Sequence, residues 1–130
     1  MVANKKAKGA NAERELVHKF WQEGWAAARM AGSGSTTLPC PDLIVGNALK
    51  TLTIECKVTT QRTQYFSQKE IEDLEHFARR LNAEPWVAVK FNRDAWYFVP
   101  IHDLEQTPGQ KKLSRQRAKS LGFSFVDLTK

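Results

Sequence analysis

The segment Thr51–Val58 alternates strictly between apolar and polar side chains, and no other part of the chain limits the possible folds so strongly. Successive side chains of an extended strand point to opposite faces. One face of this strand is therefore apolar, with Leu52, Ile54, Cys56 and Val58. The other face is polar, with Thr51, Thr53, Glu55 and Lys57. The pattern predicts a strand that is buried on one face and presents Glu55 and Lys57 as neighbours on the other.

A second strand is expected directly before this one. Residues Asp42–Val45 and Leu49–Val58 are both rich in strand-forming side chains, and Gly46-Asn47 between them is typical of a tight turn. The two strands are therefore expected to pair antiparallel. In such a pair the start of the first strand lies opposite the end of the second, so Asp42 is expected to meet Glu55.

Two carboxylates with a lysine beside them are suited to metal-assisted chemistry. A hard divalent cation prefers oxygen ligands. Lys57 would stabilise negative charge on a phosphate or orient an attacking water. A plain interpretation stays open, because Asp after Pro41 is common at a strand start and Glu-x-Lys is ordinary on a solvated strand face.

A helix is expected over Ala10–Glu23, closed by Gly24 in the usual position after a helix. At about 100° per residue, its buried face collects Leu16, Val17, Phe20 and Trp21. Glu13 falls on the same face, where a carboxylate loses hydration and needs a partner. It is expected to converge on Asp42 and Glu55 around a cation. The alternatives are an ion pair with an arginine such as Arg29, or a place where the helix frays.

The second expected helix has a well-marked start. Ser67 and Glu70 form a capping-box pattern, and Phe66 and Ile71 are spaced for a hydrophobic staple. The apolar stripe that follows is made of Ile71, Leu74, Ala78 and Leu81.

The remaining segments complete an α/β pattern. Strands are expected at 25–31, 86–91 and 95–99, then a short helix at 114–121 and a last strand at 123–128. The aromatic side chains Trp86, Trp96, Tyr97 and Phe98 are interpreted as core rather than as a surface that stacks on bases. The order of elements predicts one domain over residues 1–130 with a central mixed sheet flanked by helices. Residues 1–9 are expected to form a flexible basic segment.

Composition narrows the class of partner. The chain has 20 Lys and Arg against 14 Asp and Glu, a net charge of +6 that favours a polyanion. No apolar run approaches the ~20 residues that span a bilayer, and no signal peptide is evident. Cys40 and Cys56 do not lie in a zinc-binding spacing, so both are expected to be reduced thiols in a cytoplasmic protein.

Several of these residues together resemble a known family. Pro41-Asp42 with Glu55-Cys56-Lys57 is similar to the PD-(D/E)xK nuclease motif. The preceding Lys8-Gly9, Glu13-Arg14 and Ser33-Gly34-Ser35 resemble the archaeal Holliday junction resolvases. The resemblance covers about residues 5–99. It implies a restriction-endonuclease-like fold and a homodimer that cleaves four-way DNA junctions with Mg²⁺, for which Mn²⁺ is expected to substitute.

The resemblance also implies roles for individual residues. Glu13, Asp42, Glu55 and the Cys56 backbone carbonyl would hold the metal, Lys57 would be catalytic, and Ser33 would act beside the scissile phosphate. The residues expected to contact DNA are Lys5, Lys6, Lys8, Arg14, Arg29, Ser33, Ser35 and Arg62. The loop that contains both serines also fits a plain mobile connection.

One position departs from the family pattern, because Glu70 stands where a glutamine is expected and Gln68 lies two residues earlier. A sliding-clamp or recombinase partner is not supported, since residues 110–113 lack the aromatic pair of a clamp-binding motif. Two rival functions are a nuclease for flaps or plain duplexes and a DNA-binding module without activity. The homodimer is also expected from the sequence, because strands 86–91 and 95–99 are apolar on both faces and two matched cuts require two sites.

Overall fold

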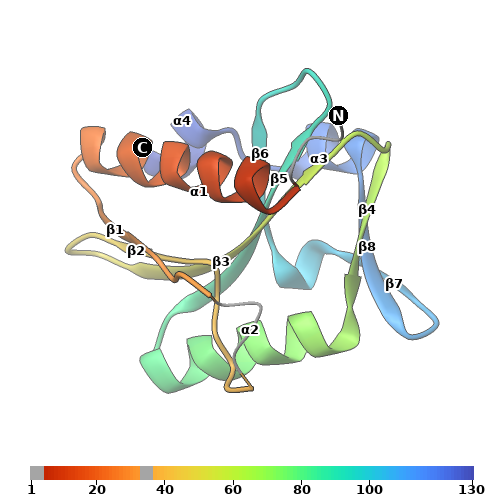
Figure 1. The fold of residues 1–130 in the computed structure, drawn as a ribbon, viewed down its shortest axis with the longest axis horizontal. Coiled ribbons are helices and arrows are strands. Elements are labelled where there is room, and N and C mark those ends of the chain that lie inside the picture. Colours follow the sequence, from red (N-terminus) through yellow and green to blue (C-terminus); the bar gives the residue numbers. More distant parts are fainter. Residues whose placement is uncertain (1–4, 33–36) are drawn as a thin grey trace.

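A five-stranded mixed sheet forms the centre of the molecule in a computed structural model, which describes residues 5–32 and 37–130 (Figure 1). Its strands are β1 (Ala26–Arg29), β2 (Leu43–Gly46), β3 (Thr51–Thr59), β5 (Glu84–Phe91) and β6 (Trp96–Pro100), in the order β1-β2-β3-β5-β6. Strands β3 and β5 are parallel, and the other neighbours are antiparallel. The predicted α/β class with a mixed sheet is confirmed.

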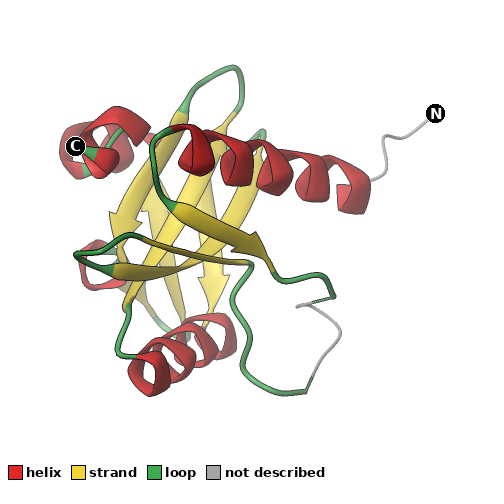
Figure 2. Ribbon diagram, turned by 90° about the vertical axis from the view of Figure 1, so that its left-hand side faces the viewer, coloured by secondary structure: helices red, strands yellow, loops and turns green. Residues whose placement is uncertain are grey.

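Helices cover both faces of this sheet (Figure 2). On one face lie α1 (Lys5–Gln22) and the short α4 (Phe125–Thr129), and on the other lie α2 (Gln68–Leu81) and α3 (Arg115–Leu121). A small antiparallel sheet of β4 (Thr63–Ser67), β8 (Gln110–Ser114) and β7 (Glu105–Thr107) lies at one side. The 3₁₀ turn η2 (Ile101–Asp103) connects β6 to β7. No helix within the described ranges is long and apolar enough to cross a membrane.

The pairing of β2 with β3 is the feature that positions the candidate site. The two strands are antiparallel with Leu43 opposite Ile54, as the sequence predicts. The turn between them is longer than expected. Within it, the Asn47 side chain accepts hydrogen bonds from the N–H groups of Leu49 and Lys50, at 2.9 and 3.0 Å. Because Gly46 is still part of β2, the turn itself is Asn47–Lys50.

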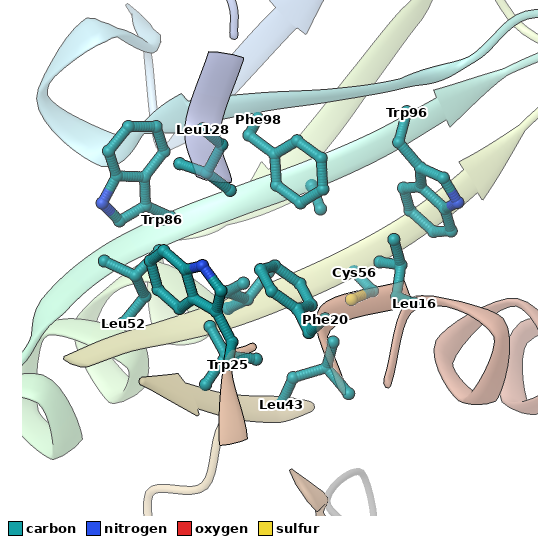
Figure 3. Close-up of a cluster of buried hydrophobic side chains, with 13 residues drawn as sticks. Leu16, Phe20, Trp25, Leu43, Leu52, Cys56, Trp86, Trp96, Phe98 and Leu128 are labelled. Carbon is teal, nitrogen blue, oxygen red and sulfur yellow. The ribbon is translucent and has the colours of Figure 1, made fainter. Parts of the chain in front are cut away.

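The core consists of two apolar clusters, one on each face of the sheet. The first packs α1 and α4 against the sheet, and Figure 3 shows Leu16, Phe20 and Cys56 meeting within it. The second includes residues of α2, α3 and the small sheet, among them Ile71, Leu113 and Ala118. Strands β5 and β6 are therefore buried on both faces, as predicted. Their apolar residues are covered within one chain. These two strands therefore do not provide the exposed apolar surface from which the homodimer was predicted.

The first helix is longer at its start than expected. It begins at Lys5 rather than Ala10, so residues 5–9 are helical rather than a separate basic segment, and residues 1–4 lie outside the described residues. Trp21 is 59% exposed, which corrects its place on the buried face. Its indole N–H instead donates to the Ala27 carbonyl at 2.9 Å, at the edge of β1. Gly24 has φ +84°, the left-handed conformation that favours glycine after a helix.

The second helix follows its predicted start closely. The Ser67 hydroxyl accepts from the Glu70 N–H at 3.1 Å, and the Glu70 carboxylate accepts from the Ser67 N–H at 3.0 Å. Phe66 and Ile71 are buried in the same cluster. Leu81 is 46% exposed and does not continue the buried stripe, because the helix ends there and the chain turns back at Asn82 with φ +56°.

The C-terminal part differs most from expectation. The small sheet of β4, β7 and β8 was not predicted, and the predicted strand at 123–128 is wrong. Phe123 makes only an isolated bridge to Phe98, and the chain then forms α4, capped by the Ser124 hydroxyl, which accepts from the Asp127 N–H at 3.1 Å. The serine cap and aromatic packing favour a helix in this segment, because Phe125 lies against Phe20 and Phe98.

Candidate active site

Strand β3 presents Glu55 and Lys57 on the face opposite the Cys56 side chain. Cys56 is buried in the first core cluster, whereas Lys57 reaches across to α2. The Lys57 ammonium lies 2.5 Å from a Glu70 carboxylate oxygen and 3.9 Å from one of Glu55. The alternation in the sequence is thus confirmed, and the polar face of β3 is covered by the start of α2 rather than by open solvent.

Asp42 is held against the same strand by two hydrogen bonds. Its backbone N–H donates to the Ile54 carbonyl at 3.1 Å, and its carboxylate accepts from the Cys56 N–H at 2.8 Å. Asp42 therefore continues the pairing with β3 just before the start of β2. It is close enough to raise the pKa of Glu55 through its charge. The predicted meeting of Asp42 and Glu55 follows from the β2–β3 register.

Glu13 reaches the site from α1 and is tied to a neighbouring strand. Its carboxylate lies 2.9 Å from the Nε of Arg29 on β1, and burial followed by the charge of Asp42 raises its pKa. The ion pair that was one alternative for Glu13 is therefore present, and the nearness to Asp42 is present as well. Among residues 5–32 and 37–130, no group of three or more His, Cys, Asp or Glu side chains is already arranged to hold a metal ion.

Negative charge accumulates around Glu55. Burial, the charge of Asp42 and contact with Glu70 together raise the pKa of Glu55 to about 9, although Lys57 opposes the shift. Burial lowers the pKa of Lys57, but the surrounding carboxylates outweigh this and raise it above its usual value. Lys57 is therefore an ammonium at neutral pH. The site contains more carboxylate than cationic side chains, and this excess of negative charge suits it to bind a divalent cation.

The raised pKa of Glu55 predicts that the metal-free protein loses stability as pH rises. An unfolded glutamic acid ionises near 4.5, while folded Glu55 keeps its proton to about 9. Between these values the folded state binds more protons, so the free energy of unfolding falls with rising pH. Glu55→Gln removes this dependence and is expected to melt above wild type at pH 8, with a smaller gap at pH 5.

Thermal unfolding in EDTA at pH 5, 6.5 and 8 measures this gap. Glu75→Gln, which removes an exposed carboxylate of α2, serves as the matched control and should follow wild type. A Glu55→Gln melting temperature that stays parallel to wild type across the range would contradict the raised pKa.

Glu70 is the site residue whose role the sequence did not reveal. One carboxylate oxygen closes the capping box at the start of α2 and the other contacts Lys57. Burial would raise the pKa of Glu70, but hydrogen bonds from Lys57 and Ser67 hold it below its usual value. Its place at the third position of α2 was evident from the capping pattern. Its contact with Lys57 depends on how α2 packs against β3.

The described residues among those expected to contact DNA have different surroundings. Arg29 is engaged with Glu13, and Arg14 is exposed and donates to the Asn11 side chain at 3.1 Å. Lys8 and Arg62 are exposed. Lys5 and Lys6 belong to α1, and Ser33 and Ser35 lie outside the described residues.

Comparison with known proteins agrees with this architecture. A family model described as archaeal Holliday junction resolvase matches residues 4–128. A crossover junction endodeoxyribonuclease Hjc of Archaeoglobus fulgidus is 43% identical over 123 residues, which is 95% of this chain and 90% of the relative. The protein of the same name from Methanocaldococcus jannaschii is 31% identical over 127 residues, covering 98% and 90%.

A solved structure shows the same fold. It is that of Archaeoglobus fulgidus Hjc, titled a Holliday junction resolvase from an archaeal hyperthermophile, and it superimposes with a TM-score of 0.87 at 38% identity. The superposition covers 94% of this chain and all of that structure. The mixed sheet with its flanking helices is accordingly the restriction-endonuclease-like fold. Sequence and structure agree along nearly the whole length, and the chain belongs to the archaeal Holliday junction resolvase family.

Proposed function

We propose that this chain is a metal-dependent endonuclease that resolves four-way DNA junctions by hydrolysing phosphodiester bonds. The observation that carries the proposal is the β2–β3 register, which brings Asp42, just before β2, together with Glu55 and Lys57 of β3. Family membership supports branched DNA as the substrate. Mg²⁺ is the proposed cofactor, with Mn²⁺ as a substitute, because the donors are oxygen atoms.

The metal would be held by Asp42, Glu55 and the Cys56 carbonyl. In an extended strand the N–H and C=O of one residue point to the same side. Since the Cys56 N–H donates to Asp42, its carbonyl is directed to that side too. Glu13, paired with Arg29, would supply a further carboxylate oxygen beside them, because Mg²⁺ prefers oxygen ligands. When bound, the metal would acidify a water and neutralise charge on the phosphate.

Lys57 serves as a cation rather than as a base. Its pKa is raised by the neighbouring carboxylates, so it keeps its proton at neutral pH. An ammonium at this position donates hydrogen bonds to a phosphate oxygen and stabilises the charge that develops there. Glu70 holds that ammonium before substrate arrives.

A nicking assay on a synthetic four-way junction, a flap and a plain duplex tests the proposed function. Wild-type protein with Mg²⁺ is expected to cut the junction in preference to the other two substrates. Faster cutting of the flap or the duplex would favour the rival nuclease function. Tight junction binding without cutting in Mg²⁺ or Mn²⁺ would favour a DNA-binding module.

Variants of Glu70 separate its two contacts. Glu70→Gln keeps an oxygen for the Ser67 N–H but loses the charge beside Lys57, so it is expected to lower the cleavage rate about 10-fold, the lower end of what supporting residues contribute. Its melting temperature should change little. Ser67→Ala removes the hydroxyl cap, which typically costs about 1 kcal/mol, and should lower the melting temperature while leaving the rate nearly unchanged.

Single-turnover cleavage and thermal unfolding measure the two effects in the same preparations. If Glu70→Gln loses rate only in proportion to stability, or if Ser67→Ala loses as much rate as Glu70→Gln, then Glu70 acts through the helix alone.

We also propose that the working unit is a two-fold homodimer. One chain carries one set of Asp42, Glu55 and Lys57, and two matched cuts need two sets. A hollow of about 410 Å³ at the C-terminal end of α2 offers a surface for the second copy. It is lined by Leu38, Pro39, His76, Phe77, Arg80 and Leu81. Leu38 and Leu81 are 72% and 46% exposed, and a closed two-fold contact is the commonest way to bury such residues.

A mixed dimer of wild-type and Asp42→Asn chains tests this arrangement. It is expected to nick one strand of a junction and leave the symmetry-related strand whole, because one of its two sites lacks the carboxylate. Differently tagged chains allow the mixed species to be isolated, and end-labelled junctions report each strand. A monomer in analytical ultracentrifugation that cuts both strands at full rate would overturn the homodimer.

A further inference from the structure

A groove of about 520 Å³, lined by polar and charged residues together with a few apolar ones, lies beside the candidate active site and has no role in the chemistry described so far. It is formed by the N-terminal half of α1, the end of β3 and the turn between β5 and β6, which meet at one corner of the molecule (Figure 1). The residues that give it its character are Lys8, Asn11, Thr59, Lys90, Asn92 and Arg93. Two other lining residues, Ala12 and Val58, are adjacent in sequence to Glu13 and Lys57.

The cationic side chains in this groove have no carboxylate partner in the part of the chain that the structure describes. Lys8, Lys90 and Arg93 form no ion pair with any residue in the described ranges, and Glu15 is the single carboxylate in the lining. Two cations of the candidate site are instead engaged with carboxylates, Arg29 with Glu13 and Lys57 with Glu70. Three unpaired cations from separate elements create a local positive potential, which attracts a polyanion. A groove of about 520 Å³ with cations from different elements suits a chain of phosphates better than a single small anion.

Arg93 supplies a second, independent observation. Its backbone has φ +56°, and among the described residues only Asn82 shares a positive φ without being glycine. Asparagine tolerates this conformation well, whereas arginine is uncommon there and pays a conformational cost. The turn is held firmly, because the Asp94 N–H donates to the Phe91 carbonyl at 3.1 Å and the Asp94 carboxylate pairs with Arg115. A long cation retained at a strained and fixed position indicates use of its side chain.

We propose that this groove binds the phosphate backbone of the DNA strand that leaves the active site, through Lys8, Lys90 and Arg93. The inference rests on the proposed function, since it takes the ligand to be junction DNA. It adds the end of β5, with Lys90, and the β5–β6 turn, with Arg93, to the DNA-binding surface. Phosphate contacts position the substrate and do not select a base sequence. The groove therefore sets how the junction arm lies relative to Asp42 and Glu55.

Lys90→Gln and Arg93→Gly test the groove by removing its charges. Binding of a synthetic four-way junction is measured in EDTA over a range of salt concentrations. Each variant is expected to bind about 3- to 10-fold more weakly at moderate salt, by the same factor for junctions of different base sequence. The slope of log affinity against log salt should become shallower by about 0.9 for each lost phosphate contact.

Arg93→Gly carries an internal check on folding. Glycine adopts a positive φ freely, so this variant is expected to unfold at the wild-type temperature or above while it binds DNA more weakly. Arg93→Lys retains the charge and should keep the wild-type salt slope. Arg79→Gln removes an equally exposed charge from α2, on the opposite face of the sheet, and should leave affinity close to wild type.

Wild-type affinity and slope in both Lys90→Gln and Arg93→Gly would overturn the proposal. An equal loss in Arg79→Gln would overturn it too, because the effect would then be one of total charge. Cleavage by wild type in Mg²⁺ is measured separately. If wild type cuts no substrate while the groove variants still show a shallower salt slope, the proposed function fails and the DNA-binding groove stands. If wild type cuts the junction and the salt slopes of the variants are unchanged, the proposed function stands and the groove proposal fails.

Discussion

Asp42→Asn is expected to lower the rate of junction cleavage by at least about 10³-fold while junction affinity stays within about 2-fold of wild type. A metal ion supplies several kcal/mol of transition-state stabilisation, and about 1.4 kcal/mol corresponds to tenfold in rate. An asparagine keeps an oxygen for the Cys56 N–H, now 2.8 Å from the carboxylate, so the β2–β3 pairing should survive. Affinity depends mainly on Lys and Arg contacts to phosphates, which this variant retains.

Single-turnover cleavage in Mg²⁺ and junction binding in EDTA measure the two quantities separately. Glu55→Gln is expected to behave in the same way, since both carboxylates are proposed to hold the metal. Asp127→Asn removes an exposed carboxylate from α4 and serves as the matched control. A cleavage rate near wild type in either Asp42→Asn or Glu55→Gln would show that the assigned site is wrong.

Replacing Mg²⁺ by Ca²⁺ is expected to preserve junction binding and to reduce cleavage by roughly 10²-fold or more. Both ions accept oxygen ligands, but Ca²⁺ takes more of them at longer distances and in a looser geometry. A water bound to Ca²⁺ is therefore positioned less accurately for attack on the phosphate. Mn²⁺ suits the same carboxylate and carbonyl donors as Mg²⁺ and should sustain cleavage.

Cleavage and binding are compared at equal concentrations of the three ions, with EDTA as the baseline. Glu55→Gln provides a matched test of the ligand assignment, because its binding should respond less than wild type to any of the ions. Equal rates in Ca²⁺ and Mg²⁺, or full activity in EDTA, would count against metal-assisted hydrolysis of this type.

The sequence by itself determined the elements whose signals are local. The alternation over Thr51–Val58 predicted both faces of β3, because the side-chain period of a strand is fixed by backbone geometry. The capping box at Ser67 and Glu70 predicted the start of α2, since both of its hydrogen bonds close within four residues. The short connection between β2 and β3 predicted their antiparallel pairing and thus the meeting of Asp42 with Glu55.

Local sequence patterns were less informative where the structure of a segment depends on contacts with residues that are distant in the sequence. Periodicity placed Trp21 on the buried face, yet β1 offers it a carbonyl at the edge of the sheet. The segment Phe123–Leu128 has apolar residues that fit a strand, but a serine cap and ring contacts with Phe20 and Phe98 favour a helix. Strand β4 pairs with β8, about fifty residues further on, and no signal within either strand identifies the other.

The candidate site shows the same division. The sequence identified the acids and the lysine, because their spacing on β3 and at the start of β2 is a local property. It left alternatives open for Glu13, and it gave Glu70 a place in the capping box but no role beside Lys57. Only the packing of α1 and α2 onto the sheet decided these, by placing Arg29 beside Glu13 and Lys57 beside Glu70. The energies of such long-range ion pairs depend on distance and burial, which exist only once the chain has folded.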